Sequence, residues 1–340
     1  MRSLRVAVTL SVVLIVPALL VAQRTTQIKL ATFVPEQSAW GKALGQMGAD
    51  WKRLTDNRVT LTIFAGGSQG TEASVLRRMR INQLQAAGLT PAGLADIDPA
   101  FNILGIPFFF DSDEEFFHVV DKLTPMLKQR LEEKGFVLLN WGHGGWVHVF
   151  TKAPVTSMGD LKETKLFTSA GDDQMVQWYK RNGFSPVPLE LTDVLMGLQT
   201  GLIEAHPSPP YLAMLMQWYR STPYMLDVAF LPALGATVVT SRAWNRISEE
   251  YRVLLLAAAR KTEGRLMREV PRQDRDAVIQ MERRGLTVTH LESPAVEAEF
   301  RSTAESFTSS MRGERVPADI FDMAIRERDN FRQSRSASLR

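Results

Sequence analysis

Hydrophobic and polar residues recur with clear periods over much of the chain. Residues 28–33 and 59–64 alternate with a period of two, which is typical of β-strands. Between them, residues 38–54 carry large apolar side chains at spacings of four, three and four positions. This spacing puts them on one face of a helix. The beginning of the chain therefore predicts a strand, a helix and a second strand.

The same rhythm continues towards the carboxyl terminus. Further strands are predicted at 84–89, 136–141, 146–151 and 165–167, and helices at 114–134, 173–182, 192–200 and from Ser248 onward. Alternation of this kind is characteristic of α/β folds with a largely parallel sheet. No internal repeat or long linker interrupts it, which favours two α/β lobes that the chain crosses more than once. The tail after Phe321 is basic and rich in serine, and we expect it to fray.

The first 22 residues are expected to lie outside the fold. Arg2 and Arg5 precede an apolar run over 6–22, which ends in Ala22 and contains Pro17. A short basic segment followed by an apolar run and small residues is typical of a secretory signal peptide. The alternative is an uncleaved anchor, but a membrane span needs roughly 20 apolar residues. We predict cleavage near Ala22 and release of the protein into the periplasm.

Composition narrows the possible functions. The 340 residues include 45% hydrophobic and 23% charged residues, and the formal net charge is +3. Such a balance is ordinary for a globular protein and gives no basic stripe, so we expect no nucleic-acid partner. The chain contains no cysteine, which excludes disulfides, thiolate metal sites, cysteine nucleophiles and a lipid anchor attached through cysteine.

Candidate catalytic residues are few. His143 and His148 are the only histidines near one another, and their spacing matches no standard zinc site, so we expect no metal or cofactor. Asp172 precedes a predicted helix, where an acid more often caps the helix than reacts. A secreted hydrolase using His143, His148 and Asp172 stays open as an alternative, although the chain has no nucleophile elbow and no phosphate-binding lysine motif.

Four segments resemble the receptors of one transport family. Residues 64–72, 104–110, 160–167 and 198–205 are similar, in the same order, to motifs of the DctP-type solute receptors of TRAP (tripartite ATP-independent periplasmic) transporters. Each segment alone is weak evidence for this family. Together, after an export signal and within an α/β pattern, they are specific. The resemblance covers roughly residues 28–285.

This resemblance implies an α/β, two-lobed periplasmic-binding-protein fold, type II-like, with hinge strands and a long bracing helix. We expect lobe I over 23–150 with a returning segment near 235–285, lobe II over 151–234, and a C-terminal helical region over 286–340. The resemblance further implies capture of a small organic ligand between the lobes and its delivery to TRAP membrane permease subunits. A periplasmic sensor that feeds a signalling partner is the alternative within the same fold.

The chain departs from the family at the positions that hold the ligand. Phe167 occupies the position where the family usually has its carboxylate-binding arginine. His148 occupies the position where a second arginine is common, and Ser208 the position where the family often has an asparagine. Phenylalanine and neutral histidine cannot reproduce the two parallel bonds of a guanidinium. We therefore expect a ligand less polar than a dicarboxylate. The protein is expected to be a monomer or weak dimer. The candidate ligand-binding residues are Phe33, Gln69, Trp146, His148, Phe167, Ser208, Tyr211 and Trp218.

Overall fold

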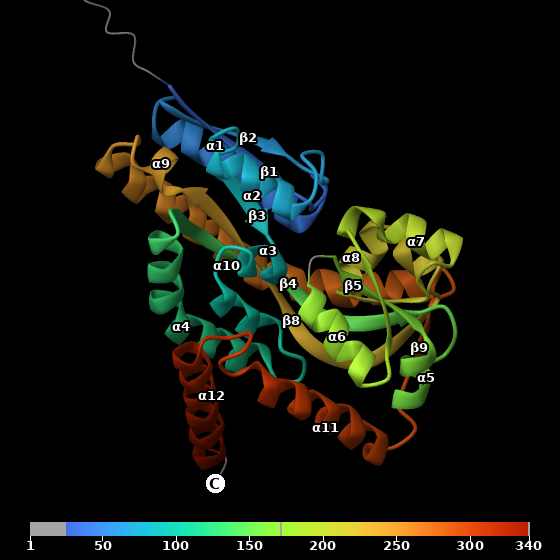
Figure 1. The fold of residues 1–340 in the computed structure, drawn as a ribbon. Coiled ribbons are helices and arrows are strands. Elements are labelled where there is room, and N and C mark those ends of the chain that lie inside the picture. Colours follow the sequence, from blue (N-terminus) through green and yellow to red (C-terminus); the bar gives the residue numbers. More distant parts are fainter. Residues whose placement is uncertain (1–24, 171, 339–340) are drawn as a thin grey trace, which may run out of the picture.

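A computed structural model describes residues 25–170 and 172–338 (Figure 1). The predicted signal peptide and its cleavage site lie outside the described residues. A single nine-stranded sheet runs through the molecule in the order β2-β1-β3-β8-β4-β7-β5-β6, and β9 pairs with β8. The two long strands in the middle, β4 and β8, belong to both halves of the sheet. The fold is therefore two α/β lobes that share a pair of strands.

Lobe I is built on the parallel strands β1, β2 and β3. Helices pack on both faces of these strands, as expected for α/β units. The bounds are β1 (Thr26–Thr32), α1 (Ala39–Leu54), β2 (Val59–Phe64), α2 (Glu72–Arg80), β3 (Ala86–Leu89), α3 (Pro91–Ala95), η1 (Pro99–Gly105), α4 (Asp113–Glu133) and α9 (Ser241–Trp244).

Lobe II is smaller and repeats the arrangement. Its strands β5 and β6 are parallel, and β5 also pairs in parallel with β7. The bounds are α5 (Met158–Glu163), β5 (Lys165–Ser169), α6 (Asp173–Arg181), β6 (Ser185–Leu189), η2 (Leu191–Asp193), α7 (Val194–Thr200), β7 (Ala205–Ser208), α8 (Pro210–Leu215), η3 (Trp218–Arg220) and β9 (Thr287–Thr289).

The shared strands β4 (Phe136–Thr151) and β8 (Tyr224–Thr240) pair antiparallel along most of their length. The sequence predicted two strands separated by the glycines at 142–145, but the structure continues β4 through them. The ladder absorbs these residues as a register shift between His143 and Trp146. Such irregularities bend a strand without ending it. The predicted lobe boundaries at 150 and 234 fall on these two strands.

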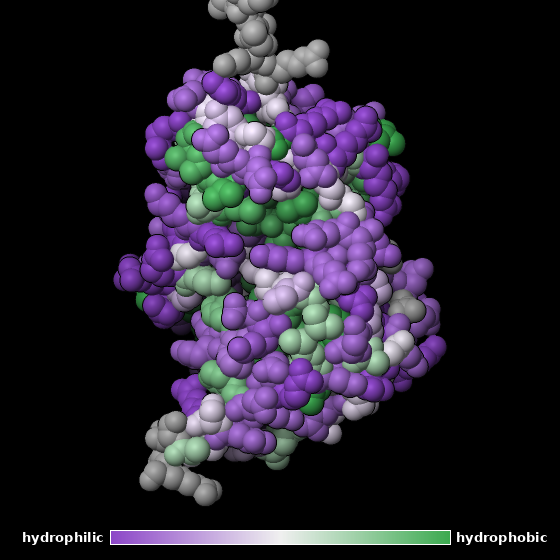
Figure 2. Space-filling model, turned by 90° about the vertical axis from the view of Figure 1, so that its left-hand side faces the viewer, coloured by the Kyte–Doolittle hydropathy of each residue, from purple (hydrophilic) through white to green (hydrophobic). Residues whose placement is uncertain are grey.

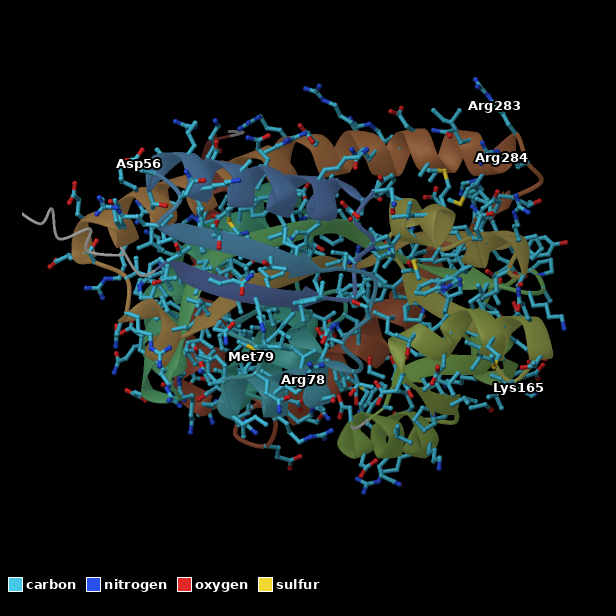
Figure 3. All side chains as sticks on the ribbon, turned by 90° about the horizontal axis from the view of Figure 1, so that it is seen from above. Asp56, Arg78, Met79, Lys165, Arg283 and Arg284 are labelled. Carbon is cyan, nitrogen blue, oxygen red and sulfur yellow. The ribbon has the colours of Figure 1, made fainter. Side chains whose placement is uncertain are left out.

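Helix α10 (Glu249–Glu282) is the longest helix described and braces both lobes. Its first half packs in a lobe I core through Leu255 and Leu266, and its second half in a lobe II core through Ala277 and Met281. Seen from above, α10 runs along the molecule and ends at Arg283 and Arg284 beside lobe II (Figure 3).

Two further helices pack on the opposite side. Helix α11 (Pro294–Met311) also crosses between the lobes, because Phe300 packs in a lobe II core and Phe307 in the main lobe I core. Helix α12 (Ala318–Ser338) packs on lobe I beside α4 and corrects the prediction of a frayed tail. Burial of Ile320 and Phe321 against lobe I stabilises this segment, despite its basic and serine-rich composition.

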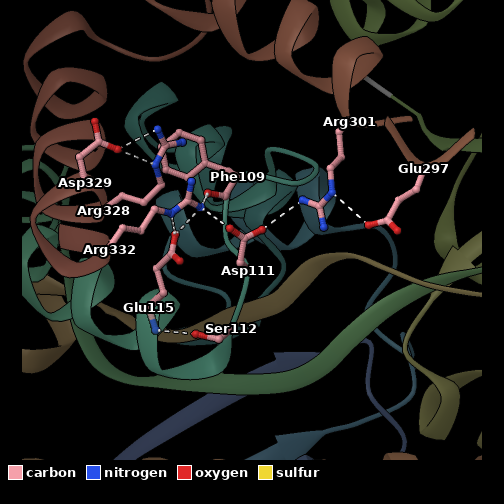
Figure 4. A network of polar contacts seen from close by, with 9 residues as sticks. All are labelled: Phe109, Asp111, Ser112, Glu115, Glu297, Arg301, Arg328, Asp329 and Arg332. Carbon is pink, nitrogen blue, oxygen red and sulfur yellow. Dashed lines mark hydrogen bonds and ion pairs between the residues drawn. The ribbon is translucent and has the colours of Figure 1, made fainter. Parts of the chain in front are cut away.

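Charged side chains fasten α12 and α11 to the start of α4. Arg332 of α12 donates to the Glu115 carboxylate at 2.8 Å and lies 2.8 Å from Asp111. Arg301 of α11 reaches the same Asp111 at 3.1 Å. Figure 4 shows these side chains converging on Asp111. One aspartate of lobe I therefore binds an arginine from each of the two C-terminal helices.

Most of the surface seen in Figure 2 is hydrophilic, and one band of hydrophobic residues crosses it. This face carries α4 and α9 of lobe I (Figure 1). Within residues 25–170 and 172–338, no helix has the length and hydrophobicity needed to cross a bilayer.

Candidate functional site

The carboxyl ends of the strands of the two lobes face one another. In open α/β sheets, ligands bind outside these ends. The loop after β2 meets the segment after β6, since a Cβ placed on Gly67 would lie 2.9 Å from the Thr192 methyl. The ring of Tyr211 in lobe II packs against a lobe I core, and its hydroxyl accepts a bond from the Ala39 N–H. The lobes therefore touch across the expected cleft.

His148 of β4 and Ser208 of β7 are directly opposite one another in the antiparallel pair of these strands. The Nδ1 of His148 is 3.2 Å from the Leu226 carbonyl oxygen. Burial lowers the pKa of His148, so the ring is neutral at neutral pH, and Nδ1 must carry its proton because a carbonyl only accepts. Nε2 is then an acceptor. Ser208 donates to the Pro209 carbonyl at 3.1 Å.

Phe167 and Trp218 pack together in a lobe II core. The Phe167 residue is 6% exposed and Trp218 is 2% exposed. Phe167 is one of the candidate ligand-binding residues, but its side chain packs against α7 in this core. Trp218 meets the His206 ring edge to face at 5.1 Å. Its indole N–H has no hydrogen-bond partner in the described structure.

Trp146 lies on the hinge, half-buried, where its indole N–H donates to Asp113 at 2.8 Å. Its side chain lines a hollow of about 660 Å³ between β8 and the start of α11, together with Phe108 and Phe110. Phe108 and Phe110 belong to the loop before α4, and Arg301, which also lines the hollow, belongs to α11, so the hollow lies where lobe I, β8 and α11 meet.

Phe33 and Gln69 follow the first two strands of lobe I, as predicted. Phe33 is half-buried and packs against the same core as Tyr211. The Gln69 side chain accepts a bond from Arg78 of α2 at 2.6 Å. Phe33 and Tyr211 therefore pack against the same lobe I core, His148 and Ser208 are paired across neighbouring strands, and Phe167 and Trp218 lie in a lobe II core.

Asp274 of α10 binds backbone groups of both the hinge strand β4 and lobe II. Its carboxylate accepts the backbone N–H of Tyr211 at 2.9 Å and that of Trp146. Burial, with a smaller contribution from the charge of Asp113, raises the pKa of Asp274 to about 7. Gly145 makes this approach possible, because a methyl group there would overlap the Asp274 carboxylate.

Comparison with known proteins places this arrangement in a family. The sequence model described as bacterial extracellular solute-binding protein, family 7 (DctP), matches residues 30–313. The chain belongs to this family. Its relatives are periplasmic solute-binding proteins of TRAP transporters.

Two curated relatives illustrate the similarity. The chain is 24% identical over 282 residues to a solute-binding protein of Roseobacter denitrificans, covering 82% of this chain and 85% of that protein. It is 26% identical over 203 residues to the ectoine/5-hydroxyectoine-binding periplasmic protein UehA of Ruegeria pomeroyi, covering 58% of this chain and 60% of UehA.

A solved structure shares the fold. The crystal structure of DctP7, a Bordetella pertussis extracytoplasmic solute receptor binding pyroglutamic acid, superposes with a TM-score of 0.82 at 22% identity. The alignment covers 90% of this chain and 100% of DctP7. The two-lobed architecture inferred from the sequence is thereby confirmed.

Members of this solute-binding family are receptors, and the structure does not assemble the hydrolase alternative. Asp172 caps α6 through the Met175 N–H and is paired with Arg315. His143 is buried beside Asp113, at 3.7 Å, and His148 bonds to Leu226. The two histidines are five residues apart on one strand, roughly 16 Å at about 3.3 Å per residue. Asp172, His143 and His148 therefore have separate partners, and the structure does not bring them together around one substrate.

Sequence reasoning missed Asp274 and Arg315. Both lie in strongly charged segments, 272–276 and 312–315, whose pattern is typical of a solvated surface. Arg315 also lies beyond the end of the family match. Neither segment carries a signal that separates one buried ionisable group from its exposed neighbours, because the distinction depends on which distant element covers the residue.

Proposed function

We propose that this chain captures a small organic ligand between its two lobes in the periplasm and delivers it to the permease subunits of a TRAP transporter. The facing carboxyl ends of the two sets of strands, joined by the shared strands β4 and β8, support this proposal. A molecule enclosed there contacts both lobes, so its binding favours their closure.

The ligand is proposed to be less polar than a dicarboxylate. His148 occupies the position where the family commonly has an arginine, and its proton is already donated to the Leu226 carbonyl. Its remaining nitrogen accepts hydrogen bonds, so it favours an N–H or O–H group over a carboxylate. Phe33 and Tyr211, which pack against a common core of lobe I, add aromatic surface. A ligand with donors and an apolar body fits these groups better than a diacid does.

The first experiment is native mass spectrometry of the exported protein, followed by release and identification of any retained small molecule. Titration calorimetry then compares ectoine, pyroglutamate and a C4 dicarboxylate, because UehA is an ectoine-binding protein and DctP7 binds pyroglutamic acid. We expect the dicarboxylate to bind at least tenfold more weakly than the preferred ligand. Tight dicarboxylate binding would overturn the proposed ligand class.

A single substitution sharpens this test. His148→Arg restores a guanidinium at the position where related receptors commonly carry one, and we expect it to improve binding of a carboxylate. Ser208→Ala removes a neighbouring hydroxyl without adding charge and serves as the control. Equal carboxylate affinities in both variants would show that residue 148 does not face the ligand.

Delivery to a permease is tested separately from binding. Vesicles containing the cognate permease should accumulate the identified ligand only when the receptor is present. Ligand binding without receptor-dependent uptake would favour the alternative of a sensor that acts on a signalling partner. Size-exclusion chromatography with light scattering tests the expectation of a monomer or weak dimer.

A further inference from the structure

An arginine beyond the family match reaches across from lobe I to lobe II. Arg315 follows α11, and its guanidinium donates two parallel bonds to the Asp172 carboxylate, at 2.6 and 2.5 Å. The Arg315 side chain is 12% exposed and that of Asp172 29%. Bidentate, charge-assisted pairs of this kind are stronger and more directional than ordinary surface ion pairs.

Each partner is fixed to a different lobe. The Arg315 carbonyl accepts a bond from the Asn102 side chain at 3.0 Å, and the adjacent Val316 is fully buried in the lobe I core. Asp172 is the N-terminal cap of α6 in lobe II, where it accepts the Met175 N–H at 3.0 Å. The length of the ion pair therefore depends on how the two lobes are placed relative to one another.

The surrounding charges make this pair more than an isolated contact. Burial raises the pKa of Asp96 in lobe I, Arg80 opposes that shift, and the charge of Asp172 adds to it. Burial likewise raises the pKa of Glu190 in lobe II, with contributions from Asp193 and Asp96. Contact between the lobes thus gathers carboxylates from both sides. Arg315 offsets the repulsion that this approach creates.

The position of the pair links it to ligand capture. Asp172 follows the carboxyl end of β5, on the side of the sheet where ligands bind. We propose that Arg315 and Asp172 form a latch across the edge of the cleft, which holds the lobes together and sets how readily they separate to admit or release a ligand. Arg315 is thus a positioning residue that acts through Asp172.

The latch rests on the proposed capture of a ligand between the lobes, but its test needs no ligand. The chain has no cysteine, so Lys52→Cys and Met196→Cys introduce two unique sites for spin labels. Lys52 is exposed on α1 of lobe I, and Met196 is 69% exposed on α7 of lobe II. Pulsed electron paramagnetic resonance then measures the distribution of distances between the lobes.

Three variants carry the test. Arg315→Gln leaves Asp172 charged among other carboxylates, and we expect it to lower the ratio of closed to open molecules about tenfold. Asp172→Asn keeps the helix cap, since asparagine caps well, and removes one repelling charge, so we expect a smaller change. The double variant should resemble Asp172→Asn rather than the sum of the two effects.

A matched control pair lies a few residues away. Arg312 and Asp322 form a bidentate pair at 2.6 Å, but both belong to the C-terminal segment on lobe I and both are more than half exposed. Arg312→Gln should leave the distances unchanged. High salt should shift the wild-type distribution towards that of Arg315→Gln, because screening weakens a partly exposed pair.

An unchanged distribution in Arg315→Gln, or an equal shift in Arg312→Gln, would overturn the latch. If Arg315→Gln does not fold, the salt titration of the wild-type protein decides, and insensitivity to salt would overturn it. Failure to find a ligand leaves these distances unaffected. Failure of the latch leaves ligand binding and uptake to be judged on their own measurements.

Discussion

Two sets of connections fasten helices α10, α11 and α12 to the rest of the molecule, and they differ in chemistry. On one side, carboxylates of α10 accept backbone N–H groups without a paired cation: Glu263 binds the Trp141 N–H at 2.9 Å, and Asp274 binds Tyr211. On the other side, Arg301 of α11 and Arg332 of α12 bind carboxylates, as Figure 4 shows. Arg315, in the loop between these helices, binds the Asp172 carboxylate. The first connection consists of hydrogen bonds to carboxylates, and the second consists of ion pairs.

The difference has a consequence for how each connection responds to its surroundings. A buried carboxylate without a cation has a raised pKa, and burial is the main cause for both Glu263 and Asp274. Their contacts therefore depend on pH. Ion pairs that are partly exposed depend on ionic strength instead. The first connection is therefore sensitive to pH and the second to ionic strength.

The largest expected effect comes from closing the space that Asp274 occupies. Gly145 has a φ of +94°, and a side chain there would overlap the Asp274 carboxylate. Gly145→Ala should lower the free energy of unfolding by about 3 kcal/mol or more, as for other strained or overpacked sites. Urea denaturation measures this change.

The control lies on the same helix as Asp274. Gly264 has helical backbone within α10, and a Cβ there would meet only the end of the Arg268 side chain at 3.4 Å. Gly264→Ala should stabilise the protein by roughly 0.5–1 kcal/mol. Similar destabilisation by both substitutions would contradict the special role given to Gly145.

On the ion-paired side, Arg332→Met should have the next largest effect. The Glu115 side chain is only 4% exposed and would lose its arginine. We expect a cost of about 2 kcal/mol, below that of a fully buried pair because Arg332 is itself partly exposed. Thermal or urea unfolding at low salt is the measurement.

Arg312→Met is the matched control for that change, because its pair with Asp322 is exposed. Such pairs contribute little to stability. The difference between the two variants should shrink as salt is added. A difference independent of salt would mean that lost packing, rather than lost charge, accounts for the effect.

The smallest expected effect concerns the pH dependence of the contacts made by α10. The pKa of Asp274 rises from an ordinary 3.8 to about 7, so the folded protein keeps a proton that the unfolded chain releases in between. Stability from this group is therefore full below about pH 4 and is lost as the pH rises to about 7. Asp274→Asn should remove this decline, a relative gain of about 1 kcal/mol at pH 8 after allowance for partial exposure.

Asp276→Asn serves as the comparison, since Asp276 is exposed on the same helix. It should leave the slope of stability against pH unchanged. If Asp274→Asn shows the wild-type slope as well, another group carries the pH dependence, and Glu263 is the first candidate on α10.

Local pattern predicted the elements well where one face of each is buried. The spacing of Trp40, Leu44, Met47 and Trp51 predicted α1, which begins one residue after its Ser38 cap. The alternation over 59–64 predicted β2. The prediction of a break at the glycines of 142–145 was wrong, because pairing with β8 keeps this segment in the sheet. The basic composition of the tail suggested fraying, but Met323, Ala324 and Ile325 pack against the lobe I core.

The sequence by itself determined the class of the protein: two α/β lobes and kinship with TRAP receptors follow from periodicity and from four short motifs in order. The tertiary structure alone decided which side chains do what. Phe167 lies in a core, and His148 uses its N–H in a hydrogen bond to the Leu226 carbonyl. Arg315 binds Asp172 although 143 residues separate them. Periodicity records which face of an element is buried, but the partner that buries it is supplied by distant parts of the chain.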